Sequence, residues 1–227
     1  MFYNPHHDED TLIVNAGDSK EFPLHLHDTP FVMNIAIHGG LKYIRLLEKD
    51  YDTYLYVETF GNKTSDTLII EVHPTGTLLP DADKVTYLGT AMVGRGTFVW
   101  HIFYLVRDAV GTPDEDDTTD DKPMYEDLYT IYKYPFDPNG STTINIDSSH
   151  VKPLYAGMQY GRPTIWVQLK LERGEQTKAQ AALNIIGSDE EFISDYISLN
   201  EVALEDDGTI RRVFCNVKYE RQEGSEA

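Results

Sequence analysis

Cysteine, clustered basic residues and long apolar runs are scarce or absent in this chain of 227 residues. Cys215 is the only cysteine, so no disulfide can form within the chain. No stretch approaches the roughly 20 consecutive apolar residues that a membrane-spanning helix needs. Residues 1–10 show neither the basic nor the apolar segment of a secretory signal, so we expect a protein that is made in a cytoplasm and does not enter a membrane.

Positive charge is scarce as well. Lys and Arg number 19 against 38 Asp and Glu, which gives a formal net charge of −19 at pH 7. Nucleic-acid binding depends on clustered cations, and the nearest approach to a cluster is the isolated pair Arg211 and Arg212. Catalytic signatures are also missing, since the chain has no Gly-x-Ser-x-Gly elbow and no phosphate-binding Gly-Lys-Ser/Thr loop. The sequence therefore predicts a protein that is not an enzyme and has no nucleic-acid partner.

What the chain does contain is a series of short strand patterns rich in aromatic residues, with 15 Tyr and 9 Phe. Residues 31–37 end at Gly39-Gly40 and residues 41–47 follow at once, which predicts a hairpin. Residues 165–171 alternate apolar and polar side chains, as a strand with one face in a core does. We predict an all-β fold made of two β-sandwich modules, Ig-like or jelly-roll-like.

The acidic run Asp114 to Asp121 separates the two modules. Six of its eight residues are acidic, and packed strand cannot hold so much like charge. The prediction is an N-terminal module over 1–111, an acidic linker or loop over 112–123, and a C-terminal module over 124–227.

One helix is predicted in the second module, near residues 189–199. Ser188 and Glu191 have the spacing of a capping box. Apolar residues follow at helical intervals: Phe192, Ile193, Tyr196 and Ile197.

Two groups of residues are candidate metal ligands. His25 and His27 flank Leu26 in a predicted strand, so both imidazoles would lie on one face, as ligands of zinc do. The acidic run offers carboxylate oxygens for Ca²⁺, although it lacks the glycine and the closing glutamate of an EF-hand loop; the residues concerned are Asp114, Asp116 and Asp120. The alternatives are a polar strand face and a solvated linker with no bound cofactor.

Aromatic residues are candidates for an interface or a sugar-stacking platform. They are Trp100, Trp166, Tyr54 and Tyr56. The two tyrosines alternate with Leu55 and Val57, the pattern of a half-exposed strand. Core filling is the alternative for the tryptophans. His101, inside an apolar run, is expected to be a core or interface histidine, and Cys215 a buried structural thiol.

Residues 16–24, Ala-Gly-Asp-Ser-Lys-Glu-Phe-Pro-Leu, and the turn and aromatic strand at 94–108 carry a resemblance to a known family. A Gly-Asp turn before a Phe-containing first strand, and a Gly-containing turn before an aromatic final strand, resemble the Ig-like modules of tailed-phage baseplate and tail adaptor proteins. The resemblance covers about residues 16–111. It implies a non-enzymatic sandwich that joins one virion component to another, and no catalytic residues transfer.

The sequence thus leads to one main hypothesis and two alternatives. The main hypothesis is a structural or assembly protein of a tailed-virus virion, such as a tail or baseplate adaptor or a capsid decoration protein. Its partners would be other virion proteins or further copies of itself in a homo-oligomer. The first alternative is a carbohydrate-binding β-sandwich, with Ca²⁺ as a candidate cofactor. The second is a metal-dependent enzyme built on His25 and His27.

Overall fold

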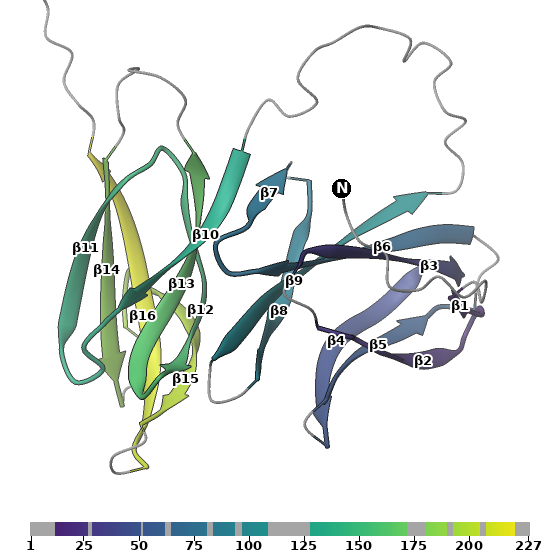
Figure 1. The fold of residues 1–227 in the computed structure, drawn as a ribbon, viewed down its shortest axis with the longest axis horizontal. Helices are drawn as coiled ribbons and strands as arrows, with labels where there is room; N and C mark the ends of the chain where they lie inside the picture. The colour runs from purple at the N-terminus through teal and green to yellow at the C-terminus, as the bar shows by residue number, and fades with distance from the viewer. Residues whose placement is uncertain are drawn as a thin grey trace, which may run out of the picture. The chain divides into compact units, whose positions relative to one another are not determined.

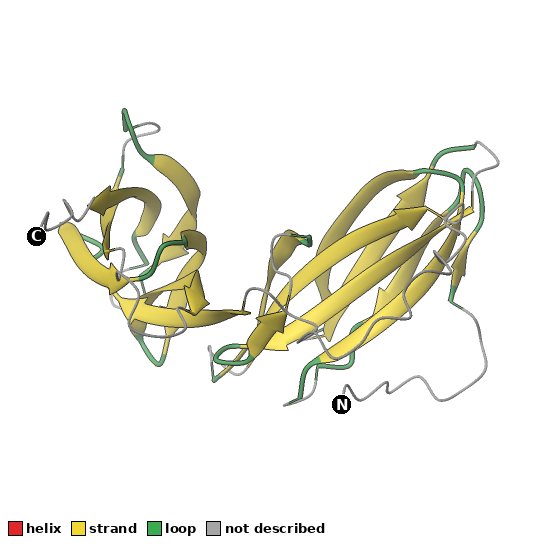
Figure 2. Cartoon of the chain, turned by 90° about the horizontal axis from the view of Figure 1, so that it is seen from above, coloured by secondary structure: helices red, strands yellow, loops and turns green. Residues whose placement is uncertain are grey.

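A computed structural model describes residues 12–26, 29–50, 52–61, 65–80, 84–93, 97–108, 128–171, 180–189, 193–204 and 208–220. All regular elements in these segments are β-strands, and no helix occurs among them (Figures 1 and 2). The predicted all-β class is confirmed. Across the same segments no helix is long and apolar enough to cross a membrane.

The described residues divide into two compact units. Unit 1 draws on residues 1–74, 81–91 and 99–126, and unit 2 on 75–80, 92–98 and 127–227. Two short segments that precede the acidic run therefore belong to unit 2. Their contacts include the amide of Gly76, which donates to the carbonyl of Ile131 at 3.0 Å, and the hydroxyl of Tyr160, which donates to the carbonyl of Thr97 at 3.3 Å.

Unit 1 contains two sheets. The strands of the five-stranded sheet lie in the order β1-β3-β6-β9-β8, and those of the three-stranded sheet in the order β2-β5-β4. The strands are β1 (Ile13–Val14), β2 (Ser19–Pro23), β3 (Phe31–His38), β4 (Leu41–Lys49), β5 (Asp52–Thr59), β6 (Ser65–Pro74), β8 (Thr86–Val93) and β9 (Phe98–Asp108).

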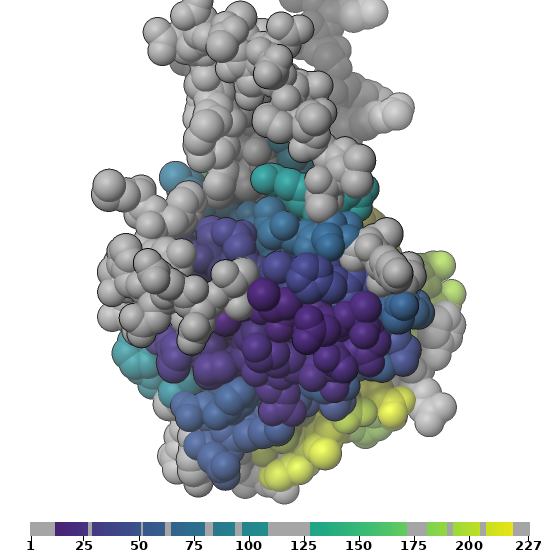
Figure 3. Space-filling model, turned by 90° about the vertical axis from the view of Figure 1, so that its right-hand side faces the viewer, coloured from purple at the N-terminus to yellow at the C-terminus, as the bar shows by residue number. Residues whose placement is uncertain are grey.

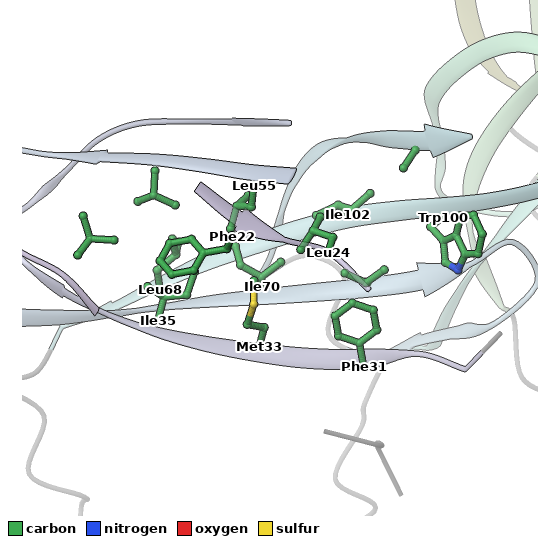
Figure 4. Packing of buried hydrophobic residues seen from close by; sticks show 14 of the residues in the cluster. Phe22, Leu24, Phe31, Met33, Ile35, Leu55, Leu68, Ile70, Trp100 and Ile102 are labelled. Carbon is green, nitrogen blue, oxygen red and sulfur yellow. The ribbon is translucent and has the colours of Figure 1, made fainter. Parts of the chain in front are cut away.

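The core of unit 1 lies between these two sheets. Alternation places every second side chain of β3 and β5 inside, where Ile35, Ile37, Leu55 and Val57 are fully buried. Burial of a side chain of this size stabilises the fold by about 1.5–3 kcal/mol. Figure 4 shows side chains of both layers meeting in this core; those labelled are Phe22, Leu24, Phe31, Met33, Ile35, Leu55, Leu68, Ile70, Trp100 and Ile102.

Unit 2 also contains two sheets, in the orders β12-β13-β10-β7 and β11-β14-β16-β15. A second apolar cluster, which includes Ile165, Val167, Leu183 and Cys215, forms its core. The strands are β7 (Leu78–Pro80), β10 (Leu128–Pro135), β11 (Ser141–Asp147), β12 (Val151–Gln159), β13 (Arg162–Leu171), β14 (Gln180–Ser188), β15 (Ile197–Ala203) and β16 (Ile210–Glu220).

The predicted helix near 189–199 is wrong for the residues that the structure describes. Ser188 is the last residue of β14, residues 193–196 form a turn, and β15 begins at Ile197. The turn has a hydrogen bond from the amide of Tyr196 to the carbonyl of Ile193 at 3.3 Å, and Asp195 has a φ of 66°. A left-handed residue ends a helix, so the apolar spacing here belongs to a turn followed by a strand. Glu191 lies outside the described residues.

Candidate functional site

Of the predicted metal ligands, His25 alone lies in the described part of the chain. β2 ends at Pro23, so His25 lies in the segment after the strand, with an exposed side chain, and the expected strand geometry is wrong there. His27, Asp114, Asp116 and Asp120 lie outside the described residues. Within the described residues, no group of three His, Cys, Asp or Glu side chains could hold a metal ion.

Neither tryptophan offers a ring to a sugar. Trp100 is 5% exposed and packs in the core of unit 1, and Trp166 is fully buried in unit 2, beside Tyr155 at 5.9 Å between ring centroids. A stacking platform needs an exposed ring face. The core-filling alternative accounts for both residues.

Tyr54 and Tyr56, by contrast, lie on the outer face of the three-stranded sheet. Their neighbours Leu55 and Val57 point into the core, so the two tyrosines point away from it. The strand register sets Arg45 of β4 and Glu21 of β2 on either side of Tyr56. We name this surface the tyrosine-lined face; its side chains are Glu21 and Pro23 of β2, Tyr43, Arg45, Leu47 and Lys49 of β4, and Asp52, Tyr54, Tyr56 and Glu58 of β5.

An arginine and two tyrosines form the centre of this face. The guanidinium carbon of Arg45 lies 5.4 Å from the ring centroid of Tyr56 and 5.8 Å from that of Tyr43. The two rings meet edge to face, with centroids 6.3 Å apart. Cation–π contacts at exposed sites are worth about 0.5–1 kcal/mol each, so both contacts favour this position of the guanidinium.

Two ion pairs flank this centre. Lys42 donates to Glu58 at 2.5 Å, and this hydrogen bond raises the pKa of the lysine. Lys49 donates to both carboxylate oxygens of Glu21, at 2.7 and 2.6 Å, and its ammonium lies 6.0 Å from the ring centroid of Tyr54. Both lysines are about half exposed, so the pairs add little to stability and mainly fix where the charges lie.

The β2 side of this sheet borders solvent along the length of the strand. Four of the five residues of β2 are exposed. In Figure 3 the purple surface, which includes β2, is open to the viewer.

A second polar group is buried on the outer face of the five-stranded sheet. His73 and His101 stand opposite each other on β6 and β9, and both are at most 1% exposed. Nε2 of His73 lies 3.1 Å from a carboxylate oxygen of Glu71, and Nδ1 of His101 lies 3.0 Å from the hydroxyl of Thr90. Burial, with a further contribution from His73, lowers the pKa of His101 to about 3. His101 is thus neutral at physiological pH, as a histidine built into a core is.

Cys215 is also confirmed as a structural residue. It is fully buried in β16, and burial raises the pKa of its thiol to about 12. A thiol held in the protonated form is a poor nucleophile.

The sequence predicted only part of the tyrosine-lined face. Tyr54 and Tyr56 stood out by their alternation, whereas Tyr43 and Arg45 gave the same strand pattern without a sign that they would meet them. The missing information is the register between β4 and β5, which includes an irregularity between Leu41 and Tyr43. Chemically, this surface can stack on flat groups and donate hydrogen bonds to carboxylates.

Comparison with known proteins adds one finding. The family model described as "Domain of unknown function (DUF7352)" matches residues 21–112, which is less than half of the chain and includes all of β3 to β9. No curated protein and no solved structure matches the chain. In this chain, the residues similar to that family thus carry most of the tyrosine-lined face.

Proposed function

We propose that this chain is a non-enzymatic structural protein that acts through protein–protein contacts, as a component of a tailed-virus virion. A tail or baseplate adaptor and a capsid decoration protein are the two roles that fit. The observation that carries the proposal is the tyrosine-lined face, where aromatic rings and an arginine lie outside a sheet whose other side is filled by core.

This composition is the one that protein interfaces favour. Tyrosine and arginine are enriched among the residues that dominate binding energies, because each combines a large contact area with hydrogen-bonding groups. The contacts of Arg45 with Tyr43 and Tyr56 hold these side chains in place before any partner arrives. Side chains that are already ordered lose less entropy on binding.

The charge of the face also supports a docking role. The chain has a net charge of −19, whereas the side chains of the face and the adjoining Lys42 include three cations and three carboxylates. A partner can therefore approach this surface without the repulsion that an acidic surface would exert on another acidic protein.

A carbohydrate-binding sandwich is the second candidate. It rests on Tyr43, a residue that is 48% exposed and whose ring could stack on a sugar. With both tryptophans buried, the tyrosines would have to supply all the stacking. Titration against a glycan panel, with and without Ca²⁺, tests it; the sandwich should bind at least one glycan more weakly after Tyr43→Ser, and silence across the panel removes this candidate.

The experiment that tests the main proposal is quantitative mass spectrometry of virus particles purified from the cells that make this chain. A virion part should be present at a fixed copy number set by the symmetry of the particle. Light scattering of the purified chain, repeated with a chelator, shows whether it assembles by itself and whether a metal contributes. A chain that is absent from particles, monomeric and without a protein partner would refute the proposal.

A further inference from the structure

Among the residues that the structure describes, β4 is an unpaired edge of the three-stranded sheet. In the order β2-β5-β4, the strand β4 has a neighbour on one side only. It is nine residues long and contains no proline, and across the described segments no hydrogen bond joins its outer edge to another strand. An edge of this kind presents backbone donors and acceptors that an added strand can pair with.

Two inward-facing apolar side chains at this edge would become more deeply buried if a strand were added. Ile44 and Leu46 point toward the core and pack against it, but both stay partly exposed. Their partners on the central strand, Val57 and Leu55, are fully buried. An added strand with apolar side chains on its inner face would cover the exposed part of Ile44 and Leu46.

Cationic side chains outnumber carboxylates on β4, which favours an acidic partner. The strand carries three cations, Lys42, Arg45 and Lys49, and one carboxylate, Glu48, within a chain of net charge −19. The two lysines are paired with Glu58 and Glu21. Arg45 contacts two rings but has no carboxylate partner among the described residues, so its N–H groups remain available to an oxygen acceptor. A guanidinium with free N–H donors is suited to bind a carboxylate through two parallel hydrogen bonds.

A second copy of this chain fits this edge poorly. If two β4 strands paired antiparallel about their middle residue, Arg45 would face Arg45, and like charges directly opposite are destabilising. The tyrosine-lined face is also small. Three strands about 4.8 Å apart and eight residues long, at about 3.3 Å per residue, span roughly 400 Å². A stable interface buries about 800 Å² on each partner.

We propose that β4 binds an extended acidic segment of a partner protein, which adds to the sheet as a fourth strand. A carboxylate of this segment pairs with Arg45 beside Tyr43, and the apolar residues on either side of that carboxylate cover Ile44 and Leu46. The inference rests on the proposed function, because it names the kind of protein segment that the assembly contact uses.

The test uses a fluorescein-labelled peptide of nine residues in which valine and glutamate alternate, titrated against the full chain by fluorescence anisotropy. Two control peptides carry lysine in place of glutamate, or proline at the centre. The glutamate peptide should bind at least ten times more tightly than either control. Arg45→Glu should weaken binding at least tenfold, whereas Lys218→Glu, an exposed charge on β16 of unit 2, should leave it unchanged.

Amide hydrogen exchange then separates strand addition from simple charge attraction. Bound peptide should slow exchange at alternate amides of β4, and circular dichroism should show that Arg45→Glu is folded. Equal binding of the glutamate and lysine peptides, no effect of Arg45→Glu, or unchanged exchange along β4 would each overturn the inference. A chain found in virus particles that fails these tests would keep its proposed function and lose only this binding mode.

Discussion

The two units differ at an edge of their sandwiches, which is covered by a side chain in unit 2 and left unpaired among the described residues of unit 1. In unit 2, the side chain of Asn200 in β15 accepts a hydrogen bond from the amide of Ala156 at 2.8 Å and donates one to its carbonyl at 2.6 Å. A side-chain amide thereby takes the place of a neighbouring strand for β12. In unit 1, nothing described closes β4 in this way. The contrast shows that a single side chain can pair with the backbone groups of an edge strand. An edge strand whose backbone groups stay unpaired is therefore a candidate binding site for a partner.

An irregularity in β15 makes the closure in unit 2 possible. The register with β16 shifts between Ser198 and Glu201, which frees Asn200 from regular alternation. Bulges of this kind redirect a side chain. On β4 the irregularity lies near the start of the strand, so Arg45 keeps its regular place opposite Tyr56.

The largest expected effect concerns Cys215, which reports on unit 2 alone. Because the thiol is fully buried and its pKa is raised to about 12, it should react with Ellman's reagent only after unit 2 opens. We expect reaction at pH 8 to be at least about a thousandfold slower than in urea, as ordinary domain stabilities imply. Rapid reaction of the native chain would mean that unit 2 opens more readily than a closed sandwich should.

The next effect belongs to unit 1 and follows from His101. Its folded pKa of about 3 lies below the ordinary value of 6.5, so its contribution to stability is complete above pH 6.5 and is lost as pH falls toward 3. The loss is of the order of 5 kcal/mol over that range. Urea unfolding followed by Trp100 fluorescence in a Trp166→Phe background measures it, since Trp100 is in the core of unit 1.

The control is His101→Gln, which keeps a polar group near Thr90 but does not titrate. Between pH 6.5 and 3, the free energy of unfolding of this variant should change less steeply with pH, because about one proton fewer is taken up on unfolding. The groups around His101 that also carry or accept protons are Glu71, His73 and Tyr87, through the contacts of His73 with Glu71 and of Thr90 with Tyr87. An unchanged slope in His101→Gln would assign the acid sensitivity to one of these groups instead.

Asn200→Ala should remove the two hydrogen bonds that cover the edge strand β12 in unit 2. It leaves the amide and the carbonyl of the fully buried Ala156 without their partner, at a cost of about 1–3 kcal/mol. The rate at which Cys215 becomes reactive measures this loss in unit 2, while Trp100 fluorescence in unit 1 should be unaffected. Asn184→Ala is a matched control, because the Asn184 side chain accepts a single exposed hydrogen bond from Thr143 at 2.8 Å. Equal losses for the two variants would show that Asn200 does not close the edge.

Much of this fold could be predicted from the sequence because strand alternation is a local property. The predicted strands at 31–37, 41–47 and 165–171 match β3, β4 and β13 within two or three residues. The helix failed because apolar spacing alone does not show that Asp195 adopts a left-handed conformation. The placement of residues 75–80 in unit 2 depends on pairing between β7 and β10, which are far apart in the chain.

The candidate site was also predicted only in part, because some of its features depend on contacts between strands. Tyr54 and Tyr56 were predicted as outward residues of one strand, which alternation alone can establish. Their contacts with Arg45 and Tyr43 required the register between two strands. The burial of Trp100 and Trp166 required the packing of whole sheets, and the sequence left both core filling and an exposed stacking platform open for them.

The smallest expected change in stability is that of Arg45→Ala, and it gives the most direct comparison between β4 of unit 1 and the edge covered by Asn200 in unit 2. Arg45→Ala should change the stability of unit 1 by less than about 1 kcal/mol, because the entropy of ordering the exposed arginine side chain offsets most of what its contacts with Tyr43 and Tyr56 contribute. Urea unfolding followed by Trp100 measures this change. If Arg45→Ala were as costly as Asn200→Ala, Arg45 would be a structural residue of its edge, as Asn200 is. A near-neutral Arg45→Ala that abolishes peptide binding would instead show that β4 keeps this arginine for a partner.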